Sequence, residues 1–122
     1  MKEKRGRVPQ SNKPKSVLFV YGSLLDAAHR VEVIGREVAA IPATIRGYER
    51  GRGRYFYLRK RPGRETPGLL LLDLTAPEFA ILDRYEEVPV LYTREQIEVS
   101  GTDGSPVRCW VYLPTRRVLR DE

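Results

Sequence analysis

Runs of apolar residues separated by turn-forming residues predict a domain built mainly from short strands. Val17–Tyr21 and Gly68–Leu74 are continuous β-favouring runs, which are typical of buried strands. Apolar residues also recur over Val38–Tyr48, but the proline inside this segment favours an edge strand or a bent strand. Tyr55–Leu58 predicts a further strand, and Arg59–Pro67, which contains a Pro-Gly pair, predicts a loop.

Regular alternation nearer the C-terminal end predicts a β-hairpin. Tyr92–Ser100 and Val107–Leu113 both alternate in side-chain character, as half-buried strands do. Gly101–Gly104 lies between them and has the composition of a turn. We therefore expect two neighbouring antiparallel strands.

One segment predicts a well-defined helix. Thr75 and Glu78 form a capping box, in which the Thr75 hydroxyl accepts from the Glu78 amide and the Glu78 carboxylate reaches back. The helix should run to about Glu87, because Pro89 prevents it from continuing much further. Asp26–Ile34 has weaker helical character. Five to seven strands with one main helix and short flanking helices predict an α+β domain, and closure into a small mixed β-barrel would remove exposed strand edges.

Composition narrows the class of protein. The chain has 122 residues, of which 41% are hydrophobic and 31% charged, and this balance excludes both a disordered polyelectrolyte and a membrane protein. The longest apolar runs are far too short to cross a bilayer. A single cysteine excludes an internal disulfide and any multi-cysteine metal cluster. We expect one folded domain in the reducing cytoplasm.

The net charge of +6 is unevenly distributed. Residues 1–16 carry six basic residues and one acidic residue, whereas residues 17–122 carry sixteen and fifteen. We interpret residues 1–16 as a disordered basic leader, residues 17–114 as the folded domain and residues 115–122 as a loose polar tail. A nucleic-acid-binding arm is the alternative interpretation of the leader.

Glu86 is the first candidate for chemistry. On a helical wheel it falls between Phe79 and Leu82, on the apolar face, whereas Glu87 falls on the other side. An ionised carboxylate that faces a core is costly unless it is paired or has a function. Partial burial also raises the pKa of a glutamate, which makes it a better proton acceptor near neutral pH. The alternative is a carboxylate at the rim of the core, or one paired with Arg94.

The second candidate is the segment at the end of the first strand, Tyr21-Gly22-Ser23-Leu24. Glycine lets the backbone turn sharply and approach a ligand closely. Successive exposed N–H groups there would hold a carboxylate or a developing oxyanion. An ordinary strand-to-loop turn is the alternative.

Further motifs follow these candidates in a particular order. After the Tyr-Gly-Ser-Leu segment come an apolar strand led by Gly68, a helix that ends in Leu82-Asp83-x-x-Glu86, a Tyr92-x-Arg94 segment, and a late strand with Tyr112 near its end. In order, spacing and context these motifs resemble the gamma-glutamylcyclotransferase-like family, over about Val17–Leu113.

The resemblance implies a small barrel with flanking helices and a pocket at one end. It also implies a reaction in which the α-amine of a gamma-glutamyl substrate attacks its own γ-carbonyl, releasing 5-oxoproline and an amine. Glu86 would be the general acid/base, the backbone of Tyr21, Gly22, Ser23 and Leu24 would bind the substrate carboxylate or the oxyanion, and Tyr92 and Tyr112 would line the pocket. Neither a cofactor nor a metal is implied.

Some features depart from the family pattern or favour other functions. The family often has glycine where this chain has Glu87, and the Arg50–Arg64 loop has no counterpart and would shape a substrate-specific rim. Arg46–Arg64 contains eight basic residues, one acidic residue and four aromatic residues, so a nucleic-acid-binding barrel is a rival. A non-catalytic binding module on the same fold is another. The leaving amine and the oligomeric state stay open.

Three single residues have structural interpretations. His29 is the only histidine, and we expect it on the surface. Cys109 alternates with apolar neighbours, which predicts a buried strand residue rather than a reactive thiol. Arg94 is expected to pair within the protein, for example with Glu98, rather than with a substrate carboxylate.

Overall fold

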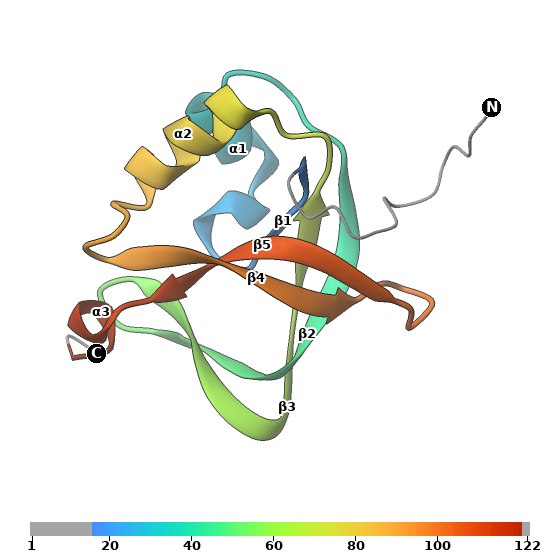
Figure 1. The fold of residues 1–122 in the computed structure, drawn as a ribbon, viewed down its shortest axis with the longest axis vertical. Helices are drawn as coiled ribbons and strands as arrows, with labels where there is room; N and C mark the ends of the chain where they lie inside the picture. Colours follow the sequence, from blue (N-terminus) through green and yellow to red (C-terminus); the bar gives the residue numbers. More distant parts are fainter. Residues whose placement is uncertain (1–15, 121–122) are drawn as a thin grey trace.

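Five strands close into a mixed barrel in the order β1-β3-β2-β4-β5 (Figure 1). The structure is a computed structural model, and it describes residues 16–120. The strands are β1 (Leu18–Val20), β2 (Ala40–Arg52), β3 (Phe56–Leu71), β4 (Tyr92–Ser100) and β5 (Pro106–Pro114). The predicted α+β barrel is therefore confirmed, with the lower of the expected strand numbers. Apart from Ser16, the predicted leader lies outside the described residues.

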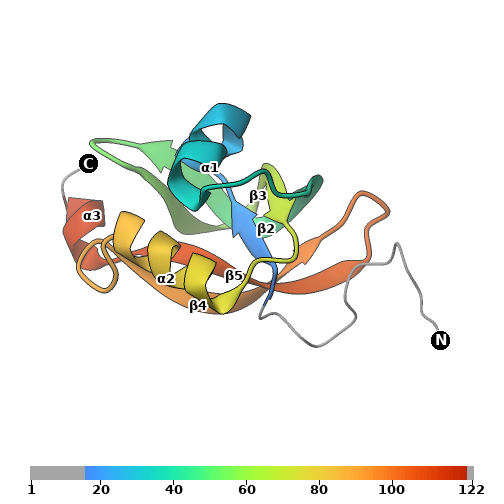
Figure 2. The ribbon, with the colours of Figure 1, turned by 90° about the horizontal axis from the view of Figure 1, so that it is seen from above.

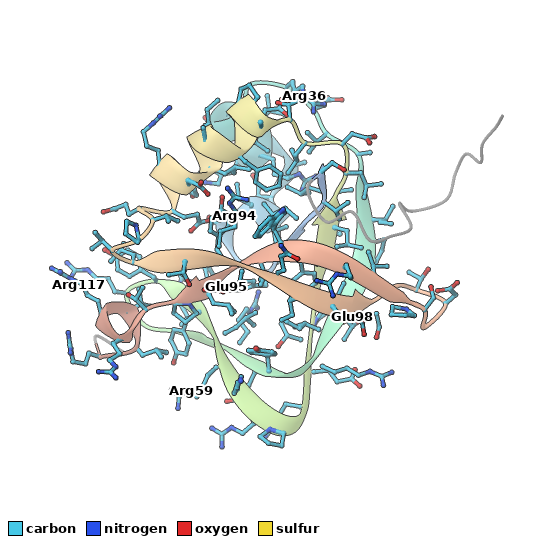
Figure 3. The ribbon with its side chains drawn as sticks, viewed as in Figure 1. Arg36, Arg59, Arg94, Glu95, Glu98 and Arg117 are labelled. Atoms are coloured by element: carbon cyan, nitrogen blue, oxygen red, sulfur yellow. The ribbon has the colours of Figure 1, made fainter. Side chains whose placement is uncertain are left out.

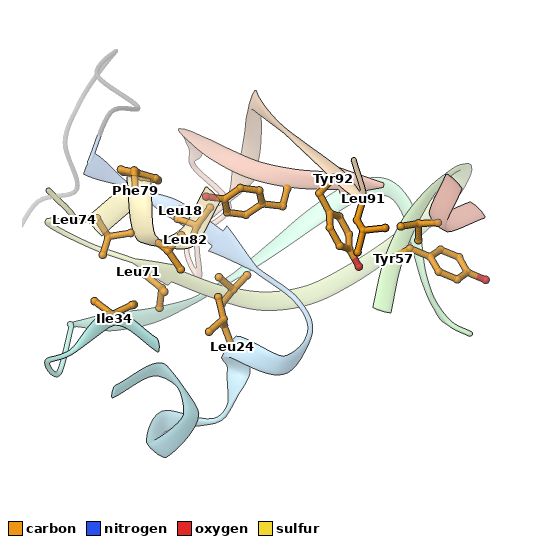
Figure 4. Close-up of a cluster of buried hydrophobic side chains, with 13 residues drawn as sticks. Leu18, Leu24, Ile34, Tyr57, Leu71, Leu74, Phe79, Leu82, Leu91 and Tyr92 are labelled. Carbon is orange, nitrogen blue, oxygen red and sulfur yellow. The ribbon is translucent and has the colours of Figure 1, made fainter. Parts of the chain in front are cut away.

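β1 closes the barrel and separates two hydrophobic clusters. It pairs with β3 antiparallel and with β5 parallel. Leu18 and Val20 belong to a cluster that includes Phe79 and Leu82 (Figure 4). Phe19 belongs to a second cluster, to which all five strands contribute, and this cluster fills the barrel interior. Because successive side chains of a strand point to opposite faces, this short apolar run supplies both clusters.

The predicted loop over Arg59–Pro67 is wrong, because β3 continues through it. β2 pairs with β3 on both sides of this segment, with Tyr48 opposite Lys60 and Arg46 opposite Glu65, and only residues 61–64 have no β2 partner in the register. The register shifts between Arg46 and Tyr48, and Gly47 and Gly63 have positive φ angles of 83° and 88° at this irregularity. A bulge accommodates the Pro-Gly pair without ending the strand.

Gly68 allows β3 to pass very close to β1. A Cβ atom at this position would lie 2.3 Å from the Val20 carbonyl oxygen and 2.6 Å from the Phe19 ring. No side chain fits at that separation. The glycine that begins the apolar run is therefore required by the packing of the first strand.

Two of the three α-helices within residues 16–120 lie beside β1 (Figure 2). α2 (Ala76–Tyr85) begins with the predicted capping box at Thr75, and α1 (Ala27–Ile34) begins at Asp26, whose carboxylate accepts from the His29 amide. α1 and α2 contact each other at the end of the barrel next to β1 (Figure 2). A 3-10 turn, η2 (Ser23–Leu25), connects β1 to α1.

The C-terminal residues differ from the loose tail that we expected. α3 (Arg116–Arg120) is helical, and Val118 is buried in the same cluster as Leu18. A helix of five residues is too short to show an apolar period in the sequence. No helix within residues 16–120 has the length and apolar character needed to cross a membrane.

Candidate active site

All the candidate site residues border one pocket of about 380 Å³ at the end of β1. The buried part of its wall includes Tyr21, Leu24, Tyr92 and Tyr112, and Glu86 and Gly22 are half-buried. The structure thus brings together segments that lie far apart in the sequence. The pocket wall also contains residues that the sequence did not single out: Phe19, Val20, Arg52, Arg54, Tyr55, Phe56, Tyr85, Glu87 and Leu91.

Glu86 is placed by the C-terminal end of α2. Its amide donates to the Leu82 carbonyl at 2.8 Å, as in a continuing helical turn. Within residues 16–120 its carboxylate has no hydrogen-bond or ion-pair partner, and burial raises its pKa to about 7. An acid whose pKa lies near neutrality exchanges protons readily, which suits a general acid/base.

Glu87 has a different environment from Glu86. Its side chain is exposed, and its φ angle of 55° lies in the left-handed region. This is the position just after the helix where glycine is the usual residue. Glu87 therefore adopts the backbone conformation that a glycine would adopt at this position, and α2 ends at Tyr85, shortly before it.

The backbone bends sharply at Gly22. Phe56 packs against this glycine so closely that a Cβ atom would lie 3.0 Å from the Cβ atom of Phe56. Arg50 holds the bend from outside, since its Nη1 donates to the Tyr21 carbonyl at 2.8 Å. Within residues 16–120 the N–H groups of Gly22, Ser23 and Leu24 donate to no other protein group. Three amide donors are therefore available in the pocket wall.

The hydroxyl groups of the three tyrosines among the candidate site residues, Tyr21, Tyr92 and Tyr112, all donate hydrogen bonds within the protein. Tyr21 donates to the Tyr112 carbonyl at 2.5 Å, Tyr92 donates to the Phe56 carbonyl at 2.5 Å, and Tyr112 donates to Asp83 Oδ1 at 2.7 Å. Burial is the main cause that raises the pKa of each of these phenols. As arranged, they stay neutral and define the shape of the pocket.

Arg94 pairs with Asp83 rather than with Glu98 or Glu86. Its Nε lies 2.8 Å from Asp83 Oδ1, and its guanidinium lies over the rings of Phe79 and Trp110 at 4.7 and 4.6 Å. Figure 3 shows Arg94 beneath α2, with Glu98 farther along β4. The expectation of a partner within the protein is confirmed, but the proposed partner is wrong, because α2 covers this part of the sheet.

His29 takes part in a hydrogen-bond chain that the sequence did not reveal. The Tyr85 hydroxyl lies 2.8 Å from Ser23 Oγ and 2.7 Å from His29 Nε2. The chain joins η2, α1 and the end of α2 at the rim of the pocket. Tyr85 and His29 are 56 residues apart, so no local pattern signals their contact.

Neither the cysteine thiol nor a metal-binding group contributes to this pocket in the described part of the chain. Cys109 is fully buried, as predicted, and burial raises the pKa of its thiol to about 12. The described part of the chain contains no group of three or more His, Cys, Asp or Glu side chains arranged to hold a metal ion.

The fold and the pocket define a small barrel protein in which a half-buried glutamate and a glycine bend line one pocket. Residues 18–122 match the family described as "Gamma-glutamyl cyclotransferase, AIG2-like". The chain belongs to this family.

Individual proteins resemble this chain in sequence or in fold. A Methanocaldococcus jannaschii protein named "Gamma-glutamylcyclotransferase and putative RNase MJ0434" is 33% identical over 99 residues, which are 79% of this chain and 45% of the relative. The chain thus spans less than half of that protein. The solution structure of At5g39720.1 from Arabidopsis thaliana has a TM-score of 0.74 and 25% identity, covering 84% of this chain and 70% of that one. A structure named "Gamma-glutamyl cyclotransferase" has a TM-score of 0.71 and 19% identity, covering 82% and 66%, and it supports the fold alone.

Proposed function

We propose that this chain catalyses the cyclising cleavage of a gamma-glutamyl amide or amine to 5-oxoproline and a free amine, with Glu86 as the general acid/base. The observation that carries the proposal is a half-buried carboxylate, with a pKa of about 7, in the same pocket as the Gly22 bend. Membership of the gamma-glutamyl cyclotransferase family supports the reaction class.

In the proposed reaction, one carbon–nitrogen bond forms at the γ-carbonyl carbon, another breaks there, and Glu86 transfers one proton between the two nitrogens. Glu86 takes a proton from the α-amine of the substrate, whose nitrogen forms a bond to the γ-carbonyl carbon. Where this nitrogen starts as an ammonium, its extra proton first passes to solvent water. The bond from that carbon to the leaving nitrogen breaks, and Glu86 delivers the proton to this nitrogen. Because the nucleophile belongs to the substrate, the protein needs no nucleophilic side chain of its own.

The amide groups of Gly22, Ser23 and Leu24 are proposed to bind the substrate carboxylate or the oxyanion that forms at the γ-carbonyl. Backbone donors fixed by a turn are aligned before the reaction, so they stabilise developing charge without reorganising. Two contacts support this role: Phe56 packs against Gly22, and Arg50 holds the Tyr21 carbonyl. Both restrain the bend.

The test is the release of 5-oxoproline from a panel of gamma-glutamyl amides and amines, including a dipeptide, an alkylamide and glutathione. We expect the wild-type protein to release 5-oxoproline from at least one of them. The Glu86→Gln variant should still bind that compound, measured by calorimetry, while releasing far less product. Wild-type protein that binds a gamma-glutamyl compound without turnover would instead be a binding module, the first alternative.

Nucleic-acid binding is the second alternative, and one observation favours it. Residues 46–65 contain eight basic residues and only two acidic ones, and they form most of the β2–β3 ribbon. However, Tyr57 is buried and Phe56 contributes to the pocket wall, so neither ring is an exposed platform for stacking on bases. A salt titration of oligonucleotide binding, with and without residues 1–16, distinguishes this alternative.

A further inference from the structure

The rim of the pocket carries two arginines without an acidic partner in residues 16–120. Arg52 is the last residue of β2 and Arg54 lies in the turn before β3; both line the pocket and both are exposed. Glu86 and Gly22 are more buried than either arginine. A molecule with its reacting atoms at Glu86 reaches solvent past the exposed lining residues, which include Arg52 and Arg54.

Four other arginines in the described part of the chain form ion pairs with carboxylates. Arg36 pairs with Glu78 and Arg94 with Asp83, and both Arg61 and Arg64 lie 3.6 Å from Glu49. Among the described residues, Arg52 and Arg54 have no such contact, and unlike other arginines without one, such as Arg46 and Arg84, they line the pocket. Their charge is therefore available to a bound anion.

Arg52 is held in place by an aromatic ring. Its guanidinium carbon lies 4.7 Å from the centre of the Phe56 ring, and that of Arg50 lies 5.2 Å from the same ring. Phe56 is itself tied to the pocket, since its carbonyl accepts from Tyr92. Stacking orders a guanidinium and leaves its N–H groups in the guanidinium plane free to bind a planar anion.

We propose that Arg52 and Arg54 form an anion subsite that binds a carboxylate on the leaving-group half of the substrate. The subsite selects gamma-glutamyl compounds with an anionic leaving amine over those with a neutral or cationic one. Two guanidinium groups suit a carboxylate because each offers paired N–H donors in a fixed fork. Glu87, the exposed acid on the same rim, adds repulsion toward anions, and the two arginines outweigh it. This inference rests on the proposed cyclising cleavage.

The test compares gamma-glutamyl-alanine with gamma-glutamyl-alaninamide, which differ only in the leaving-group carboxylate. For the wild type we expect kcat/KM for 5-oxoproline release to be about tenfold higher for the carboxylate, a preference that weakens as salt is added. The double variant Arg52→Gln/Arg54→Gln should lose this preference, so that the ratio of kcat/KM for the two compounds falls to about one. Thermal unfolding of the double variant and the wild type reports separately whether the variant is folded.

The matched control is Arg46→Gln/Lys60→Gln, which removes two exposed charges from the same ribbon outside the pocket. This control should keep the preference for the carboxylate. Equal wild-type rates on the two compounds, or the same loss in the control, would overturn the anion subsite and leave the cyclising cleavage standing. Release of 5-oxoproline from neither compound nor from the wider panel would overturn the proposed function itself, and the subsite with it.

Discussion

The hydroxyl of Tyr112 donates a 2.7 Å hydrogen bond to Asp83, three residues before Glu86 on α2. Arg94 donates two further hydrogen bonds to the same carboxylate, from Nε at 2.8 Å and from Nη2 at 3.2 Å. Partial burial would raise the pKa of Asp83, but these hydrogen bonds hold it below its usual value. The last turn of α2, and with it Glu86, is thereby fastened to β4 and β5.

Replacing Asp83 with asparagine should loosen this attachment. We expect Asp83→Asn to lower the free energy of unfolding by about 1–2 kcal/mol, because Arg94 loses its acidic partner in a partly exposed site. Glu98→Gln is the control, since it removes a carboxylate from the same strand as Arg94 without touching this network. Thermal or urea unfolding measures both. Equal losses in the two variants would mean that Asp83 does not hold α2 to the sheet.

Gly68→Ala should be among the most destabilising substitutions by a single methyl group. The new Cβ atom meets the backbone of β1 at 2.3 Å, so the two strands must separate. We expect a loss of about 2–3 kcal/mol in urea unfolding. A Cβ atom added at Gly101 would meet its nearest neighbour only at 3.6 Å, so Gly101→Ala should cost much less. Comparable midpoints for the two variants would contradict the close approach of β1 and β3.

The sequence predicted which residues line the candidate site better than it predicted which side chains contact one another. The helical wheel separated Glu86 from Glu87, and the Gly22 bend and capping box followed from local residue types. By contrast, the partner of Arg94 and the chain from Ser23 through Tyr85 to His29 depend on tertiary packing. The missed continuation of β3 has the same cause, because Pro62 and Gly63 signal a turn locally, whereas pairing of the residues on either side of them with β2 keeps the segment in the sheet.

The raised pKa of Glu86 predicts an effect of pH on stability. Because the folded protein binds this proton more tightly than the unfolded chain, the contribution is complete below the usual pKa of 4.5 and is lost as pH rises through about 7. Glu86→Gln, which cannot ionise, should therefore gain about 1–3 kcal/mol over the wild type at pH 8 and nothing at pH 4. Melting temperatures across this range provide the measurement. A stability difference that does not change with pH would show that Glu86 titrates normally.

The same group should control the reaction rate. For a general base with a pKa near 7, kcat/KM rises with pH through about 7 rather than through the 4.5 of an ordinary glutamate. The acid limb of the pH profile for the best gamma-glutamyl substrate tests this. An inflection near 4.5, with full activity at about pH 6, would exclude Glu86 as the titrating base.

The role of Glu86 is tested most directly by comparing two neighbouring substitutions in one assay. Glu86→Gln and Glu87→Gln make the same chemical change at adjacent positions, one half-buried and one exposed. We predict that Glu86→Gln lowers kcat for 5-oxoproline release about 10²- to 10⁴-fold while Glu87→Gln changes it less than about threefold. Equal rates for Glu86→Gln and the wild type would contradict the account.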